Sequence, residues 1–164
     1  MGRWRPPPER SSPYITRDGY AALESELRVL WKRRDGVTKA LTAAAAEGDR
    51  SENAEYIYRK KELREIDRRI GYLQKRMPEL KVVTECPAEQ SRVFFGAWVT
   101  LEDSTGEDTE YRIVGPDEFD PEKHYISMDS PLARALMKKA VDDEVRVKTP
   151  AGEAHYFILK VRYA

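Results

Sequence analysis

Two ladders of apolar residues in the first half of this 164-residue chain restrict what it can fold into. After Thr16, a suitable helix N-cap, seam-type residues recur alternately three and four positions apart, and the same spacing returns later. The first ladder is Tyr20, Leu23, Leu27, Leu30, Arg34, Val37, Leu41 and Ala44. The second is Tyr56, Arg59, Leu63, Ile66, Ile70, Leu73, Met77 and Leu80. This heptad spacing predicts two helices with one apolar seam each.

The two ladders are reflections of each other about Arg50, because facing members such as Leu30 and Ile70 lie equally far from it. A chain that folds back at Arg50 forms an antiparallel coiled-coil hairpin, and helices of about 30 residues make an arm of roughly 45 Å. Arg34 and Arg59 interrupt the seams, and we expect each to lie along its seam with the charge turned outward. Pro78 predicts that the second helix ends or kinks near Met77.

The second half of the chain has a different hydrophobic pattern, with short apolar or alternating runs separated by turn residues. The runs predict antiparallel strands within residues 92–103, 109–115, 124–130, 143–149 and 153–163. One helix interrupts them in "DSPLARALMKKAV", with Ser130 as N-cap and Pro131 at the first helical position. The predicted fold class is therefore α+β: a disordered tail (1–14), a coiled-coil hairpin (15–83), and a small antiparallel sheet domain with one helix (84–164).

Charge and cysteine content narrow the classes of function. Up to Val83 the chain has 19 basic and 13 acidic residues, and after it 10 and 16. The basic half suggests a polyanionic neighbour, but a protein that coats nucleic acid with its whole surface is not expected. The single cysteine, Cys86, excludes an internal disulfide and a cysteine-rich zinc site. Without an apolar run of signal-peptide or membrane-span type, we expect a soluble cytoplasmic protein that does not bind membranes.

Acidic residues gather at the predicted hairpin turn, "EGDRSENAEY". Asp49 and Glu52 have nearly the spacing of a capping box, which would explain them by helix capping alone. Alternatively, two carboxylates provide half of a magnesium site, because Mg²⁺ takes one or two protein carboxylates and completes its shell from elsewhere. Cys86, His124 and His155 form no nucleophile arrangement, so a self-sufficient hydrolase is not predicted.

Basic residues follow the turn along the second helix. They are Arg59, Lys60, Lys61, Arg64, Arg68, Arg69, Lys75 and Arg76, with Glu62, Glu65 and Asp67 interleaved. The acids can pair locally with the bases, which would leave an ordinary solvated face. The alternative is that the hairpin has a basic helix face leading to an acidic turn, an arrangement suited to a hairpin that inserts into a polyanionic environment.

Residues 48–77, "GDRSENAEYIYRKKELREIDRRIGYLQKRM", together with "VFFGAWV", "YRIVG" and "DSPLARAL", resemble the bacterial Gre transcript-cleavage factors. The similarity runs from about Ile15 to Tyr163. "RSENAEY" and the "RKK" run favour the GreB branch of that family, for which longer backtracked RNA is the expected substrate.

The resemblance implies an FKBP-like C-terminal domain that docks on the rim of the RNA polymerase secondary channel, and a hairpin that enters the channel. By motif matching, Asp49 and Glu52 help the polymerase hold a second Mg²⁺ that activates water for cleavage of the nascent RNA 3′ end. The same matching implies that Asp129, Ser130 and Pro131 form the loop that contacts the polymerase. Ser130 and Pro131 also suit helix capping. The residues expected to guide RNA are Arg59, Lys60, Lys61, Arg64 and Arg68.

These expectations describe a monomeric accessory factor that stimulates the polymerase and is not itself an enzyme. Two alternatives remain open at the level of sequence. A non-catalytic inhibitor of the secondary channel would share the fold and the docking loop, although the tip sequence argues against it. A prolyl isomerase is suggested only by the implied FKBP-like domain, and fold alone does not confer activity.

Overall fold

The computed structural model describes residues 10–47 and 53–163. These residues form two compact units. One unit is Asp18–Leu80, and the other combines the residues before Asp18 with those after Leu80. The two units confirm the predicted α+β class with an N-terminal helical hairpin.

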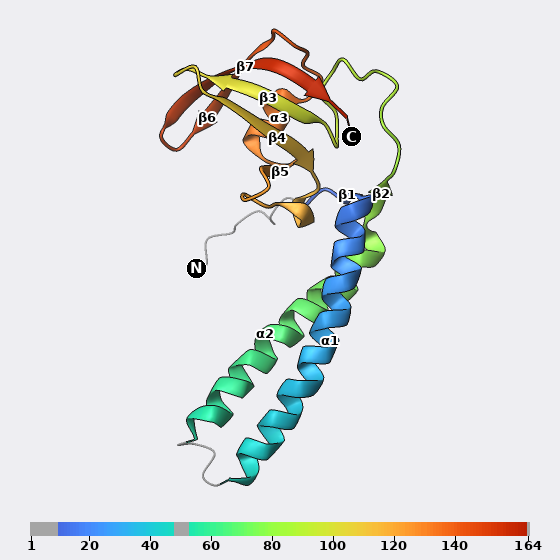
Figure 1. The fold of residues 1–164 in the computed structure, drawn as a ribbon, viewed down its shortest axis with the longest axis vertical. Helices are drawn as coiled ribbons and strands as arrows, with labels where there is room; N and C mark the ends of the chain where they lie inside the picture. Colours follow the sequence, from blue (N-terminus) through green and yellow to red (C-terminus); the bar gives the residue numbers. More distant parts are fainter. Residues whose placement is uncertain (1–9, 48–52, 164) are drawn as a thin grey trace, which may run out of the picture. The chain divides into compact units, whose positions relative to one another are not determined.

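The first unit consists of two antiparallel helices, α1 (Arg17–Ala46) and α2 (Ala54–Arg76), which lie side by side (Figure 1). Every position of the two predicted ladders is buried or half-buried, and none is exposed. The most deeply buried members are Leu23, Leu30, Val37, Ala44, Ile66, Ile70 and Leu73. The hairpin forms because each helix has a single apolar stripe that only the other helix can cover.

The two arginines in the seams behave as expected. Arg34 Nε donates to Asp67 Oδ1 across the hairpin at 2.6 Å, while Arg59 donates to Glu55 at 2.9 Å and to Glu62 at 3.0 Å. Their aliphatic stems lie along the seam and their charges meet partly exposed carboxylates. The prediction at Pro78 is also confirmed, because α2 ends at Arg76 and the 3₁₀ helix η1 (Met77–Glu79) follows.

The second unit is built on a five-stranded sheet with the order β5-β4-β3-β7-β6. The strands are β3 (Trp98–Asp103), β4 (Asp108–Val114), β5 (Tyr125–Ser127), β6 (Glu144–Thr149) and β7 (Gly152–Arg162). All five predicted strands exist, but the sheet is not wholly antiparallel, because β5 pairs with β4 in parallel. Between them the chain passes through the 3₁₀ helix η2 (Pro116–Glu118) and a further turn, so it re-enters the sheet edge in the direction of β4.

The core of this unit lies between one face of the sheet and α3 (Pro131–Leu136). Alternate residues such as Val99 and Ile113 point into it and are fully buried, as Leu136 is from the helix. The helix begins as predicted but ends at Leu136, well before Val141. Lys138 has a left-handed φ of 65°, and the backbone at Lys138 and Lys139 pairs with Val93 instead of continuing the helix.

A small parallel sheet, not predicted from the sequence, pairs β1 (Tyr14–Thr16) with β2 (Lys81–Val83). Ile15 is fully buried there. The expected tail over residues 1–14 therefore differs from the structure at its end, where Tyr14 already belongs to a strand. Gly115 is required beside β1, because a Cβ at this position would collide with the carbonyl group of Tyr14. Within the described residues, no helix combines the length and apolarity needed to cross a bilayer.

Candidate functional site

The hairpin turn leads into α2, and the structure describes it from Asn53 onward on that side. Asn53 is the N-cap of α2: its Oδ1 accepts from Tyr56 N at 3.1 Å, and its Nδ2 donates to the Ala44 carbonyl oxygen at 2.8 Å. One amide side chain thus caps α2 and ties it to the last turn of α1. The capping-box interpretation was wrong about the residue, because it gave the N-cap position to Asp49. Asp49 and Glu52 themselves lie outside the described residues.

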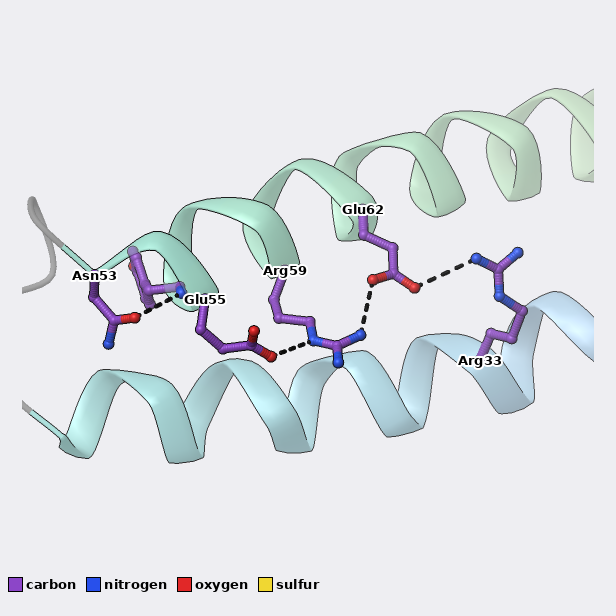
Figure 2. Close-up of polar contacts among 6 residues, drawn as sticks. Arg33, Asn53, Glu55, Arg59 and Glu62 are labelled. Carbon is purple, nitrogen blue, oxygen red and sulfur yellow. Dashed lines mark hydrogen bonds and ion pairs between the residues drawn. The ribbon is translucent and has the colours of Figure 1, made fainter.

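A chain of ion pairs runs along the hairpin behind this cap (Figure 2). Glu55 pairs with Arg59 at 2.9 Å, Arg59 with Glu62 at 3.0 Å, and Glu62 with Arg33 of α1 at 3.4 Å. Hydrogen bonds to Glu55 and then to Glu62 raise the pKa of the Arg59 guanidinium above its ordinary value. Arg59, a predicted RNA contact, is therefore committed to two carboxylates of its own helix, and Glu62 links that helix to α1 through Arg33.

The other four predicted RNA contacts lie together on a different face of α2. Lys60, Lys61, Arg64 and Arg68 are all exposed, and at 3.6 residues per turn they fall within an arc of about 100°. Lys75 falls in the same arc. None of these five cations forms an ion pair within the part of the chain that the structure describes. We call this set, Lys60, Lys61, Arg64, Arg68 and Lys75, the cationic face.

The acids of α2 do not neutralise the cationic face. Glu62, Glu65 and Asp67 fall outside its arc, and two of them bind α1: Glu62 pairs with Arg33, and Asp67 pairs with Arg34. Arg59 takes the second oxygen of Glu62. One of the predicted local pairs, Arg59–Glu62, is confirmed, whereas the residues that the structure describes show no ion pair between these acids and the cationic face. Mutually repelling cations along one solvent-facing stripe make a surface suited to a chain of phosphates.

The predicted docking loop lies at the start of α3. Ser130 Oγ accepts from Ala133 N at 3.2 Å and Pro131 takes the first helical position, so the capping role of both residues is confirmed. Asp129 has no part in the cap. Its backbone N–H donates to Ser127 Oγ at 3.1 Å, and its carboxylate accepts from the backbone N–H of Ser12 at 2.9 Å and from the Ser12 hydroxyl.

The outer face of the sheet carries a row of residues that the sequence did not reveal. Across four neighbouring strands, the paired positions are Tyr125, Arg112, Trp98 and Arg162. The Arg162 guanidinium lies 4.6 Å from the Trp98 ring centroid, and that of Arg112 lies 5.5 Å from Trp98 and 5.7 Å from Tyr125. These cation–π contacts hold the row together. The residues lie up to 64 positions apart in the chain, so only the strand register brings out the pattern.

The remaining candidate reactive groups are dispersed. His124 contacts the Glu110 carbonyl, His155 pairs with Glu144 at 3.2 Å, and Cys86 is an exposed free thiol. Over residues 10–47 and 53–163, no three His, Cys, Asp or Glu side chains are grouped so that they could hold a metal ion. The described residues therefore do not form a metal site of three or more such ligands by themselves.

Comparisons with known proteins agree over most of the chain. The family model described as transcription elongation factor, N-terminal, matches residues 13–82, and the one described as transcription elongation factor, GreA/GreB, C-term, matches residues 88–163. Transcription elongation factor GreB of Pseudomonas aeruginosa is 58% identical, covering 99% of this chain and 98% of the relative. Its counterpart in Yersinia pestis is 60% identical, covering 93% of this chain and 90% of the relative.

Solved structures of related factors also match. GreA factor homolog 1 of Thermus thermophilus is 26% identical, covers 93% of this chain and 99% of its own, and superposes with a TM-score of 0.43. A GreA/GreB factor from Nitrosomonas europaea is 18% identical, with coverage of 93% and 100% and a TM-score of 0.42.

Proposed function

Because the chain belongs to the GreA/GreB family of transcription elongation factors, we propose that it stimulates the RNA cleavage activity of backtracked RNA polymerase. In this proposal the sheet unit docks on the rim of the polymerase secondary channel, and the hairpin enters the channel. The polymerase then removes the 3′ end of the nascent RNA and resumes elongation. The chain acts as a cytoplasmic monomer and as an accessory factor, with the polymerase as the enzyme.

The cationic face of α2 carries this proposal. It is a stripe of positive charge along one side of a helix of 23 residues, or about 35 Å. Glu62 and Asp67 of α2 are engaged with arginines of α1, away from the stripe, so the charge of the stripe stays available to an anionic partner. A stripe of lysine and arginine side chains suits the sugar-phosphate backbone, which is what a factor needs if it accepts RNA of any sequence.

We propose Asp49 and Glu52 as the residues that act at the polymerase active site. The N-cap function that offered another explanation for them is filled by Asn53. Carboxylate oxygens are the ligands that Mg²⁺ prefers, and two of them complete a site whose other ligands belong to the polymerase. The ion would supply an activated water and charge stabilisation for phosphodiester cleavage.

Docking is assigned to the loop Asp129–Pro131. Pro131 is exposed, and Asp129 presents a carboxylate that the helix cap does not use. We expect Asp129→Arg to abolish most binding to polymerase while the sheet unit keeps its circular dichroism spectrum, because the side chain lies outside the core. Unchanged binding in a pull-down with purified polymerase would remove this loop from the interface.

The proposal is tested on a stalled, backtracked elongation complex with labelled RNA. Adding the protein with Mg²⁺ should release a short 3′ fragment and restore elongation when nucleotides are supplied. Binding with no fragment release, accompanied by slower nucleotide addition, would identify a non-catalytic inhibitor of the secondary channel instead. Absence of both binding and release would reject the proposal.

A further inference from the structure

The segment that precedes the hairpin is fastened to the sheet unit by two contacts of the same kind. Ser12 uses its backbone N–H and its hydroxyl to hold the two carboxylate oxygens of Asp129. Thr16 uses its own N–H and hydroxyl to hold the two carboxylate oxygens of Glu118. Ser12 and Thr16 are four positions apart, and the buried Ile15 of β1 lies between them. Residues 12–16 are therefore fixed to the rest of the sheet unit.

The first of these contacts reaches the loop assigned to docking. Ser12 and Asp129 are 117 positions apart in sequence, both half-buried, and belong to the same compact unit. The rest of the loop is held by short-range bonds, through Ser127 and Ser130. Ser12 is thus the described residue that sets the direction of the Asp129 carboxylate.

We propose that Ser12 is a positioning residue for polymerase docking that acts through Asp129. This inference rests on the proposed function. A carboxylate on an unsupported loop side chain visits several rotamers, and two donors from one residue select a single orientation. Fixing that orientation before binding reduces the conformational entropy lost on association.

The geometry favours positioning over sequestration of the acid. An ionised carboxylate offers about four acceptor positions, of which Ser12 takes two, so donors from a partner can still approach. Asp129 is only half-buried, which leaves a route for such donors. Removing the Ser12 hydroxyl should therefore weaken docking, whereas a sequestering contact would strengthen docking when lost.

The test compares binding of the full-length protein to purified RNA polymerase by fluorescence anisotropy. Ser12→Ala removes the hydroxyl donor and should raise the dissociation constant roughly three- to tenfold, the effect of one hydrogen bond to a charged group. Ser12→Thr keeps both donors and should bind like the wild type. Ser11→Ala changes the exposed neighbouring serine and is the matched control.

A double-mutant cycle separates positioning from a general structural effect. In the Asp129→Ala background, Ser12→Ala should cause no further loss of binding, because its route of action has already been removed. The same three- to tenfold loss in that background, unchanged binding of Ser12→Ala, or tighter binding would each overturn the inference. Binding is measured well below the unfolding temperature of every variant, so that a stability loss does not imitate a docking defect.

Failure of the inference and failure of the proposed function are distinguishable. Asp129→Ala alone reports whether the loop docks, and fragment release by the wild type reports the function. Weak binding of Asp129→Ala together with normal binding of Ser12→Ala would reject the role of Ser12 and leave the proposed function intact.

Discussion

Removing four of the five charges of the cationic face should change the salt dependence of activity, and not only its level. The variant replaces Lys60, Lys61, Arg64 and Arg68 by alanine, since all four are exposed on one arc of α2 and none has an ion pair within the described ranges. If each contacts one phosphate of single-stranded RNA, log–log slopes against salt should differ by about 2.8 between wild type and variant. The wild-type advantage should then shrink about 50-fold between 50 and 200 mM salt.

The assay measures the concentration of factor that half-saturates RNA cleavage, at several salt concentrations, on shallowly and deeply backtracked complexes. Salt-dependent contacts made elsewhere are common to both proteins and cancel in the difference. The loss should be larger on deeply backtracked complexes, which expose more RNA phosphates to the hairpin. Arg28→Ala with Lys32→Ala removes exposed charge from α1 and should leave the slope unchanged.

Arg59 provides an internal contrast. Because Glu55 and Glu62 already compensate its charge, Arg59→Ala should change the salt slope much less than the loss of a cation from the cationic face. Parallel slopes for the wild type and the four-residue variant, or an equal loss on both kinds of complex, would refute the reasoning and leave an ordinary solvated face.

Three further predictions concern the scaffold. Gly115→Ala should lower the free energy of unfolding by about 1–3 kcal/mol in chemical denaturation, because the added Cβ collides with the backbone of β1, which cannot move without disturbing the strand. Gly36→Ala, which places its Cβ in open space on α1, should instead raise the free energy of unfolding by about 0.5–1 kcal/mol. Asn53→Ala should cost about 1 kcal/mol of hairpin stability through loss of the N-cap, measured by thermal unfolding followed at 222 nm; no loss would show that another residue caps α2. The hydrogen bond to Arg162 lowers the pKa of Glu110, so the ionised carboxylate stabilises the fold above its ordinary pKa of 4.5, and this stabilisation is lost as the pH falls. The difference in melting temperature between the wild type and Glu110→Gln should therefore shrink below pH 4.5. A difference that stays constant with pH would contradict the assignment.

The sequence predicted the hairpin well because burial in a two-helix seam follows a strict local period. Leu23, Leu30 and Ile70 lie where that period requires, and Pro78 ends the second helix by simple sterics. The start of α3 was equally predictable, since Ser130 and Pro131 act on their immediate neighbours.

Features that depend on distant partners could not be read from the chain. The parallel direction of β5 follows from a crossover, and β1 is three residues long with a partner strand that begins at Lys81. The bond between Ser12 and Asp129 joins segments 117 positions apart, with no periodic signal to connect them.

The candidate site was predicted in part, and the capping residue shows why. "DRSEN" contains several residues that can cap a helix, and spacing alone does not choose among Asp49, Ser51 and Asn53. The structure selects Asn53 because its amide can also reach the end of α1. Likewise, the sequence shows Arg59 as one of several consecutive basic residues. It did not show that Arg59 pairs with carboxylates while Lys60 and Lys61 face solvent.

The central claim, that the hairpin brings carboxylates to the polymerase active site, is tested most directly by neutralising them without changing their shape. Asp49→Asn and Glu52→Gln should each keep the helicity of the hairpin and the affinity for polymerase. Stimulated cleavage of backtracked RNA should nevertheless fall by orders of magnitude, since losing an anionic ligand of a water-activating ion costs several kcal/mol and each 1.4 kcal/mol is about tenfold in rate. Higher Mg²⁺ should restore part of the rate. Cleavage at the wild-type rate by either neutral variant, at the same Mg²⁺ concentration and pH, would contradict the account.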